Sequence, residues 1–234
     1  MSEHTQPAAN TEQAENRDDA PLSRSSLADA AYADIRARIL DGRIAPGERV
    51  TVRPIADRLG LSATPIKAAR GRLEREGLIA SQLHRGFFVP DLGDEDAAEI
   101  YQLREALDGL AAGLAAGAPQ AADAAALLAR LCDEQETRLA ADDIDGYRRL
   151  DVEFHRALWQ ASGNSRILRA GEPMLDQMLL GNALSARQPG RGYASLREHR
   201  AIVDAIRNAD AAAAADLARA HIRSSHRSFS AATA

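Results

Sequence analysis

The sequence predicts a mostly α-helical protein with an N-terminal winged helix-turn-helix, whose wing is a small β-hairpin, and a C-terminal all-α antiparallel helical bundle. Two observations favour this fold class. Residues 50–89 read as a short helix, a tight turn, a second helix and a hairpin, whereas the chain after residue 93 shows helical periodicity without strand-like alternation. A chain of 234 residues is also long enough for two modest domains, each with its own core.

Composition gives the expected domain boundaries. Residues 1–26 begin with a stretch rich in Ala, Asn, Gln, Glu and Asp and are predicted to be a disordered tail. Residues 27–90 are assigned to the winged helix-turn-helix, and residues 91–234 to the helical domain. The segment Asp91-Leu92-Gly93 is the expected linker between the two folded domains.

Helical spacing and helix-ending residues define the turn motif. Ile55 and Leu59 recur at helical spacing in the first helix, and Gly60 is expected to end it because glycine readily adopts a positive φ. Ser62 is predicted to cap the second helix with its side chain. The second helix buries a stripe that includes Leu73 and closes near the next glycine.

The outward face of the second helix predicts DNA binding. At about 100° per residue, Thr64 and Lys67 point away from the buried stripe, and small or cationic side chains suit a major groove. After this helix, apolar residues flank a His84-Arg85-Gly86 turn, which has the form of a basic wing. The predicted DNA-binding residues are Arg53, Ser62, Thr64, Lys67, Arg85 and Gly86.

The distribution of charge agrees with this prediction. The whole chain has a net charge of −5, yet residues 22–90 carry 12 Lys and Arg against 7 Asp and Glu. The cationic part therefore coincides with the helix-turn-helix, as phosphate binding requires. Double-stranded operator DNA is the expected partner of this segment, whereas the acidic remainder of the chain does not favour nucleic acid.

The N-terminal third of the chain resembles the DNA-binding domain of GntR-family bacterial transcription regulators. The resemblance rests on residues 39–50 (ILDGRIAPGERV), 61–69 (LSATPIKAA), and LEREGLI followed by RGFFV, in that order over about 60 residues. Where the family commonly has Ser-Arg-Thr-Pro-Val-Arg-Glu, this chain has Ser62-Ala-Thr-Pro-Ile-Lys-Ala68. Ala63 removes one potential guanine contact, and Lys67 keeps a charge but not the bidentate fork of arginine. The resemblance thus implies DNA binding at an operator that differs from those of its relatives.

The number of cysteines and the hydropathy of the chain indicate in which cellular compartment the protein is expected. Cys132 is the only cysteine, so no intrachain disulfide forms and a reducing interior is expected. No run of about 18 apolar residues occurs, and no apolar signal core begins the chain. We therefore expect a cytoplasmic protein that does not associate with the membrane.

The C-terminal domain is predicted to contain six helices. Its breaks fall at segments rich in Gly, Pro, Asp, Ser or Asn, and its Ala-rich composition suits closely packed helices. The predicted helices span residues 94–117, 119–141, 143–161, 165–186, 192–208 and 210–230.

Four polar residues are predicted to face the interior of this bundle. Asp151 and His155 lie one turn apart beside a core stripe, His199 falls on an apolar line of its helix, and His221 follows Leu217 by four. Each could be a satisfied buried or boundary residue. Left unpaired, however, each would cost roughly 1–3 kcal/mol, and one shared Zn²⁺, Ni²⁺ or Mn²⁺ ion would satisfy all four. Spacing alone does not decide between these interpretations.

The same segments resemble the metal-binding form of the FCD effector domain, found in the FadR branch of GntR regulators. The pattern Asp-x-x-Phe-His-x-x-Leu is followed by Glu-His-x-x-Ile-x-x-Ala-Ile and by a histidine in the final helix. The resemblance implies that Asp151, His155, His199 and His221 bind one divalent metal per chain. With both halves matched, it covers about 200 residues.

Two further polar residues are candidates for an effector pocket. The helix that begins near residue 94 is expected to bury Ile100, Leu103, Leu107 and Leu110, and Arg104 flanks this stripe. Its guanidinium could face the cavity and bind a carboxylate, or it could pair with Asp108 four residues on. Asn182, which is polar among leucines, is the second pocket candidate.

The sequence therefore predicts a homodimeric transcription regulator, not an enzyme. A small carboxylate bound at the metal and Arg104 would shift the bundle and change the spacing of two DNA-binding heads. The alternatives are a metal-dependent hydrolase, since three histidines and an aspartate also suit catalytic zinc, and a metal sensor without an organic effector. The absence of a His-Glu-x-x-His pattern argues against the hydrolase.

Overall fold

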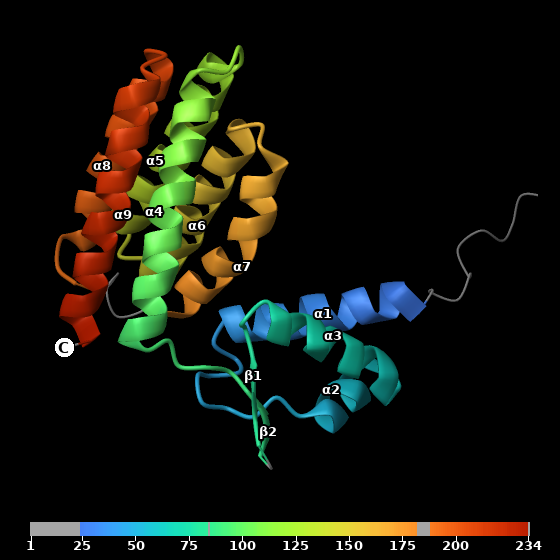
Figure 1. Ribbon diagram of the computed structural model, residues 1–234. Helices are drawn as coiled ribbons and strands as arrows, with labels where there is room; N and C mark the ends of the chain where they lie inside the picture. Colours follow the sequence, from blue (N-terminus) through green and yellow to red (C-terminus); the bar gives the residue numbers. More distant parts are fainter. Residues whose placement is uncertain (1–23, 84, 182–187, 234) are drawn as a thin grey trace, which may run out of the picture.

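A computed structural model describes residues 24–83, 85–181 and 188–233 and confirms the predicted fold class. The N-terminal domain contains α1 (Arg24–Leu40), α2 (Val52–Leu59), α3 (Ala63–Arg75), β1 (Ala80–Gln82) and β2 (Gly86–Phe88) (Figure 1). The predicted tail, residues 1–26, lies outside the described residues except for its last three, which belong to α1. Helix α1 therefore begins before the boundary predicted at residue 27.

A small apolar core holds the N-terminal domain together. Ile35 and Ile39 of α1 pack with Ile66 and Leu73 of α3, and all four are at most 1% exposed. Gly60 ends α2 with a φ of 64°, as predicted. Ser62 occupies the N-cap of α3, but its side chain makes no capping hydrogen bond, so the prediction of a side-chain cap was wrong.

Strand β2 of the hairpin makes backbone hydrogen bonds along both of its edges. In the antiparallel pair of β1 and β2, Ala80 lies opposite Phe88 and Gln82 opposite Gly86. On the other edge of β2, the amide of Val50 donates to the Phe87 carbonyl and the amide of Val89 donates to Glu48. The guanidinium of Arg70 in α3 stacks 3.8 Å from the Phe87 ring centroid, which ties the hairpin to the second helix of the motif.

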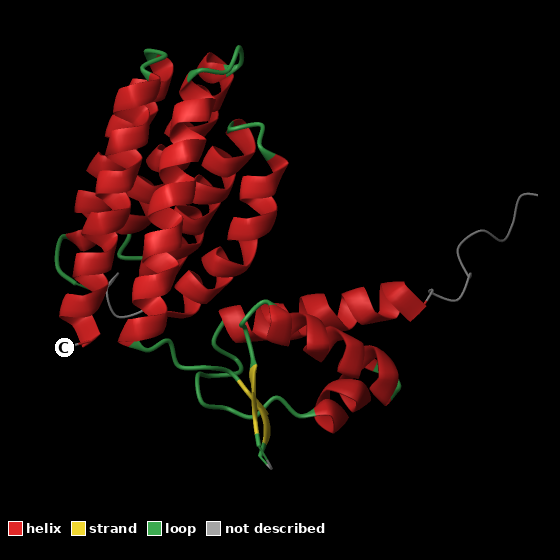
Figure 2. Cartoon of the chain, in the orientation of Figure 1, coloured by secondary structure: helices red, strands yellow, loops and turns green. Residues whose placement is uncertain are grey.

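The C-terminal domain is an antiparallel bundle (Figure 2). Its helices are α4 (Asp94–Ala116), α5 (Ala121–Ala140), α6 (Ile144–Ala161), α7 (Ser165–Gly181), α8 (Arg191–Arg207) and α9 (Ala211–Thr233). Five of them both begin and end within three residues of the prediction. Helix α7 begins at Ser165, as predicted, and its predicted end at residue 186 lies outside the described residues. Alanines at α4 positions 111, 112, 115 and 116 are buried, which permits the close packing of α4 with its neighbours.

One prediction about α4 was wrong. The side chains of Leu103 and Leu110, expected in the core, are 50% and 48% exposed, and the inward face carries Tyr101, Arg104 and Asp108 instead. The leucines do share one face of the helix, as their spacing requires. Periodicity, however, identifies residues that share a face and does not say which face the bundle covers.

Helix α7 connects the two domains. The Nε atom of Arg36 in α1 donates to the Asp176 carboxylate in α7, and Asp176 is 3% exposed. The amide of Gln177 donates to the Glu76 carbonyl at the end of α3 over 2.7 Å. Gly77 follows with a φ of 71°, and a Cβ there would lie 2.0 Å from the Gln177 amide nitrogen. The positive φ favours glycine here, and any larger residue would also displace the Gln177 amide from the Glu76 carbonyl. Among the described residues, no helix is both long and apolar enough to span a bilayer.

Replacing Arg36 with Ala should weaken the junction between the domains, because the Asp176 carboxylate stays buried without its partner. We expect a loss of about 1–3 kcal/mol in the free energy of unfolding and faster proteolytic cleavage at Asp91-Leu92-Gly93. The matched control is Arg58→Ala, which breaks a more exposed pair with Asp34 inside the N-terminal domain and should cost about 0–1 kcal/mol. Equal effects of the two changes on stability and cleavage would contradict the assigned role of Arg36.

Candidate metal centre and DNA-binding surface

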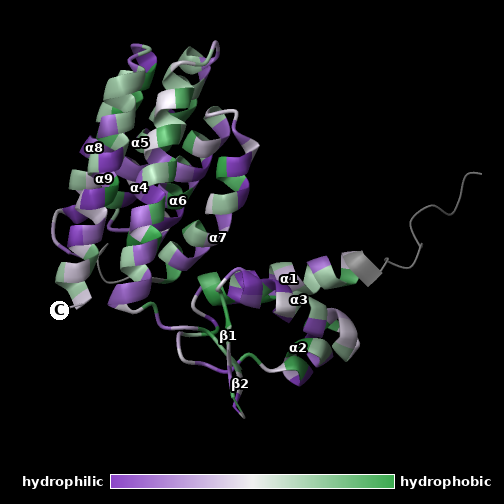
Figure 3. Cartoon of the chain, in the orientation of Figure 1, coloured by the Kyte–Doolittle hydropathy of each residue, from purple (hydrophilic) through white to green (hydrophobic). Residues whose placement is uncertain are grey.

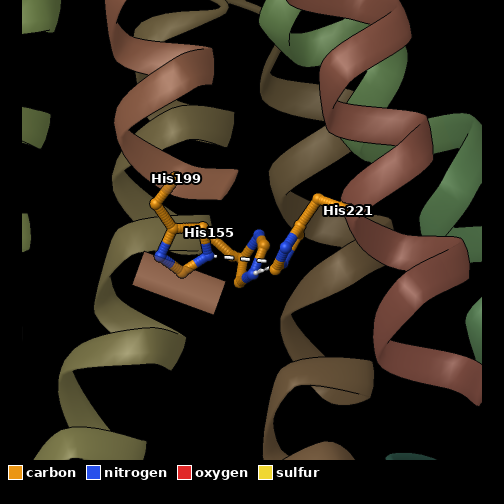
Figure 4. A group of neighbouring side chains, drawn as sticks. All are labelled: His155, His199 and His221. Atoms are coloured by element: carbon orange, nitrogen blue, oxygen red, sulfur yellow. Dashed lines mark hydrogen bonds between the residues drawn. The ribbon is translucent and has the colours of Figure 1, made fainter. Parts of the chain in front are cut away.

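Three histidines from three helices meet inside the bundle. His155 of α6, His199 of α8 and His221 of α9 are each at most 2% exposed (Figure 4). The Nε2 atom of His221 lies 3.3 Å from Nε2 of His199 and 3.3 Å from Nε2 of His155. Helical packing thus brings together three of the four residues predicted to bind metal.

The opposite nitrogen of each ring is held by an acceptor. The Nδ1 atom of His155 lies 2.6 Å from an Asp108 carboxylate oxygen, and Nδ1 of His221 lies 2.8 Å from the carboxylate of Glu198. Nδ1 of His199 lies 3.1 Å from Oε1 of Gln135, whose amide nitrogen donates to the Leu150 carbonyl and so fixes the orientation of the amide. Carboxylate and carbonyl oxygens only accept, so each Nδ1 carries the ring proton.

The three Nε2 lone pairs therefore point at one another without a proton between them. Such an arrangement repels in a dry interior, and a bound cation relieves the repulsion. Two nitrogens that each lie about 2.0–2.1 Å from one tetrahedral ion are about 3.4 Å apart, close to the 3.3 Å separations seen here. Imidazoles oriented through Nδ1 by carboxylate or carbonyl groups are also the usual surroundings of protein metal ligands. The residues present thus fit a divalent transition metal.

Asp151 lies at the edge of this cluster. Its Oδ1 atom is 3.7 Å from Nε2 of His199 and 3.4 Å from the Tyr147 hydroxyl, which donates to it. Among the described residues, one ring nitrogen of each of the three histidines lies within 4.8 Å of the other two. Asp151 is not part of this group. A small movement of Asp151 toward His199 would complete the predicted set of four.

Burial favours the neutral form of His155 and His199 by lowering the pKa of each ring. It lowers the pKa of His199 well below its usual range, and the neighbouring His221 and His155 lower it further. Burial also lowers the pKa of His155, as does Arg104, against an opposing effect of Asp108. Neutral imidazole is the form that binds a metal ion, so these two rings need not lose a proton to do so.

Arg104 lies beside the cluster, deep in the bundle. Its guanidinium is 3.4 Å from the Asp108 carboxylate, so the pairing considered as an alternative is present. Burial opposes ionisation of Asp108, yet Arg104 and His155 together hold its pKa at about 2. Among the described residues, Nε of Arg104 and Oδ2 of Asp108 have no hydrogen-bond partner. The pair thus leaves one donor and one acceptor available next to the histidines, whereas the second pocket candidate, Asn182, lies outside the described residues.

Sequence reasoning missed the residues that orient the histidines. Asp108 was identified only as a possible partner of Arg104, and Gln135 and Glu198 were not identified at all. Glu198 has a pKa of about 2 in spite of its burial, because His221 and Arg191 stabilise its charge. The one available signal was polarity on an apolar face, as at Gln135, which is fully buried.

The predicted DNA-binding residues lie on one domain and are open to solvent. Arg53, Ser62, Thr64 and Lys67 of the turn motif are exposed, as is Arg85 in the wing, while Gly86 is half-buried. Within the described part of the chain, no acidic side chain pairs with Arg53 or Lys67, in contrast to Arg58, which pairs with Asp34. These unpaired cations are available for phosphates or bases.

Sequence comparisons agree with the two-domain organisation. Residues 27–89 match the family described as bacterial regulatory proteins, gntR family, and residues 99–224 match the FCD domain. The chain is 27% identical over 190 residues to an uncharacterised HTH-type transcriptional regulator, YdhC of Bacillus subtilis, which covers 81% of this chain and 85% of the relative. It is 28% identical over 194 residues to a probable D-xylose utilisation operon repressor of Paenarthrobacter nicotinovorans, with 81% and 82% covered.

Two solved structures share the fold of this chain. A GntR protein of Rhodococcus sp. RHA1 superposes with a TM-score of 0.75 at 24% identity and covers 88% of this chain and 99% of its own. E. coli McbR/YncC superposes with a TM-score of 0.70 at 20% identity, with 84% and 93% covered. At these identities the two structures establish the fold alone.

In the metal-free protein, all three histidines should carry the proton on Nδ1, because each Nδ1 faces an acceptor. Long-range proton–nitrogen correlation spectra report which ring nitrogen is protonated. Replacing Gln135 with Leu should redistribute the His199 proton and cost about 1–3 kcal/mol in the free energy of unfolding. The exposed Gln160→Leu is the control. A His199 ring protonated on Nε2 in the wild type would contradict the assigned geometry.

Proposed function

This chain belongs to the GntR family of bacterial regulatory proteins and carries an FCD domain, and from that premise we propose that a small carboxylate bound at a metal centre controls its affinity for operator DNA. The N-terminal domain is the DNA-binding part of a transcription regulator. The observation that carries the proposal is the convergence of three Nε2 lone pairs on one point inside the effector domain. The protein would act on DNA in the cytoplasm, as a homodimer.

The proposed metal is one Zn²⁺, Ni²⁺ or Mn²⁺ ion per chain, held by Asp151, His155, His199 and His221. Three imidazoles favour these metals over Mg²⁺ or Ca²⁺, which prefer oxygen ligands. The oriented Nδ1 protons mean that no ring must change its tautomer before it binds the ion. When bound, the metal supplies a positive charge and open coordination positions inside an acidic domain.

The proposed effector is a small acid that chelates. Four protein ligands leave an octahedral ion two open positions, which suits two oxygens of a di- or hydroxy-acid. Arg104 is next to the centre, and its Nε has no partner among the described residues, so it can donate to a second anionic or polar group of the effector. The net charge of residues 91–234 is −6, so the domain as a whole does not attract anions.

Contacts between helices offer a route from this centre to the DNA-binding domain. His155 is followed in α6 by Arg156, whose Nε donates to Glu172 of α7 over 2.8 Å. Helix α7 also carries Asp176 and Gln177, which contact α1 and the end of α3. A shift of α6 on effector binding would thus reach the DNA-binding domain through α7.

DNA binding should depend on the exposed cations of the turn motif and the wing. Lys67→Ala should weaken operator binding by about 1–3 kcal/mol if Lys67 contacts a base edge, and Arg85→Ala should weaken it through loss of a wing contact. Mobility shifts on the chain's own promoter region measure both. Arg207→Ala, which removes an exposed arginine of the helical domain, is the control and should leave binding unchanged. An unaltered shift with Lys67 and Arg85 both replaced would show that this surface does not bind DNA.

Effector binding should require both the metal and Arg104. Calorimetry with a panel of di- and hydroxy-acids should detect binding to protein loaded with Zn²⁺, Ni²⁺ or Mn²⁺, and no binding after chelation. Arg104→Ala should weaken binding several-fold or more, and Arg104→Lys should restore little, because an ammonium cannot reproduce the guanidinium fork.

Two controls separate the effector contact from structural damage. Arg223→Ala removes an arginine that pairs with Glu105 on the outer side of α4 and should leave affinity unchanged. Metal content is measured on every variant, because Arg104 also contacts Asp108, which orients His155. Acid binding that survives both chelation and Arg104→Ala would refute the proposed pocket.

A further inference from the structure

Two hydroxyl side chains lie one helical turn before residues of the histidine cluster. Tyr147 precedes Asp151 by four residues in α6, and Ser195 precedes His199 by four residues in α8. Residues four apart on a helix lie on the same face, so this spacing places both hydroxyls beside the cluster. The two side chains also meet each other, because Ser195 makes a side-chain hydrogen bond with Tyr147.

Both hydroxyls lie in the interior of the bundle. Tyr147 is 4% exposed and Ser195 is 3% exposed. Figure 3 shows hydrophilic and hydrophobic residues interspersed along the helices of the bundle, so polarity in the sequence does not single out these two positions. A buried hydroxyl is unfavourable unless it forms hydrogen bonds. The partners of the two hydroxyls therefore account for their place in the core.

The two hydroxyls form a chain of hydrogen bonds that ends on Asp151. The Tyr147 hydroxyl donates to Oδ1 of Asp151 over 3.4 Å. A carboxylate oxygen only accepts, and a tyrosine hydroxyl carries its proton at neutral pH, so the direction of this bond is fixed. The Tyr147 oxygen is then available as an acceptor for Ser195. Ser195 thus donates to Tyr147, and Tyr147 donates to Asp151.

Asp151 is the least enclosed residue of the predicted metal-binding set. Its side chain is 19% exposed, whereas the three histidines are at most 2% exposed. Its Oδ1 atom lies 3.7 Å from Nε2 of His199, at the edge of the cluster. Among the described residues, no arginine or lysine forms an ion pair with this carboxylate, so the hydroxyl of Tyr147 is the group that directs it.

We propose that Tyr147 is a positioning residue for the metal, whose hydroxyl holds the Asp151 carboxylate beside the histidine cluster while Ser195 holds the hydroxyl. The inference rests on the proposed function, in which Asp151 is the fourth ligand of the ion, and it adds the group that presents this ligand. An aspartate at the edge of a core can turn toward solvent, and the hydrogen bond removes that freedom before an ion binds. Tyr147 acts through Asp151 and is not itself a ligand.

With Tyr147 included, each proposed ligand has a partner that fixes its orientation. The pairs are His155 with Asp108, His199 with Gln135, His221 with Glu198, and Asp151 with Tyr147. Partners of this kind determine how well a set of ligands is arranged before the ion arrives, and their loss lowers metal affinity. The affinity of the centre should therefore depend on a hydroxyl that does not touch the ion.

The test measures the Zn²⁺ affinity of the full chain by competition with a chelating dye. Tyr147→Phe removes only the hydroxyl and should weaken Zn²⁺ binding about ten- to a hundredfold, while the three histidines still bind the ion. Ser195→Ala should weaken binding by a smaller factor, because it removes only the support of the hydroxyl. Tyr193→Phe is the matched control. Tyr193 is 44% exposed in the first turn of α8, so its variant should bind Zn²⁺ like the wild type.

A double-mutant cycle shows whether Tyr147 acts through Asp151. In an Asp151→Ala background, Tyr147→Phe should cause no further loss of Zn²⁺ affinity, because the carboxylate that it positions is absent. A residue that only supports packing would instead weaken binding by the same factor in both backgrounds. If Tyr147→Phe does not fold, the same cycle with Ser195→Ala decides, since its smaller loss should also disappear in the Asp151→Ala background.

This inference and the proposed function can fail separately. A Tyr147→Phe variant with the Zn²⁺ affinity of the wild type, or an equal loss in both backgrounds, would overturn the role of Tyr147 and leave the metal centre standing. A wild type that binds no Zn²⁺ would overturn the metal centre itself, and with it the positioning of Asp151 for an ion.

Discussion

The helical domain is organised around three buried imidazoles whose Nε2 lone pairs face one another. That geometry is imposed from outside the trio, because Asp108 of α4, Gln135 of α5 and Glu198 of α8 hold the three Nδ1 protons. Each of these acceptors contacts Nδ1 of its histidine, and Asp108 and Glu198 are held in place in turn by Arg104 and Arg191. Such a cluster suits a bound cation, which would relieve the repulsion between the three lone pairs.

Helices α4 and α6, which contribute residues to the histidine cluster, also connect the cluster to the DNA-binding domain. Helix α4 has Arg104 and Asp108 on its buried side, Leu103 and Leu110 on its exposed side, and the linker to the DNA-binding domain at its N-terminus. Helix α6 carries His155 and, one residue on, the Arg156 that pairs with α7, which in turn contacts α1 and α3. A change at the centre would thus have two short paths to the DNA-binding domain. One runs through the hydrogen-bonded side chains of α6 and α7, and the other runs along α4 to the linker.

Much of the fold could be predicted from local signals. Gly60 and the breaks at Gly117 and Ser162-Gly163 mark real helix ends, and the histidines do face inward because apolar spacing places them there. Spacing could not tell that Leu103 and Leu110 face outward, since the choice of the buried face depends on which helices pack nearby. Nor could it pair His199 with Gln135, because those residues are 64 positions apart and meet only through helix packing. Ser62 occupies the N-cap position of α3, but its side chain makes no capping hydrogen bond. Residue type predicts the position and does not fix the side-chain rotamer.

Elemental analysis of the purified protein tests whether the three histidines form a metal centre. We expect about one Zn²⁺, Ni²⁺ or Mn²⁺ per chain in the wild type, and loss of that metal in His199→Ala. Substitution of His226, which stacks on Tyr101 away from the cluster, should leave the metal in place. Chelation should also lower the melting temperature of the wild type. Protein that contains no metal, even after reconstitution at neutral pH, would contradict the account.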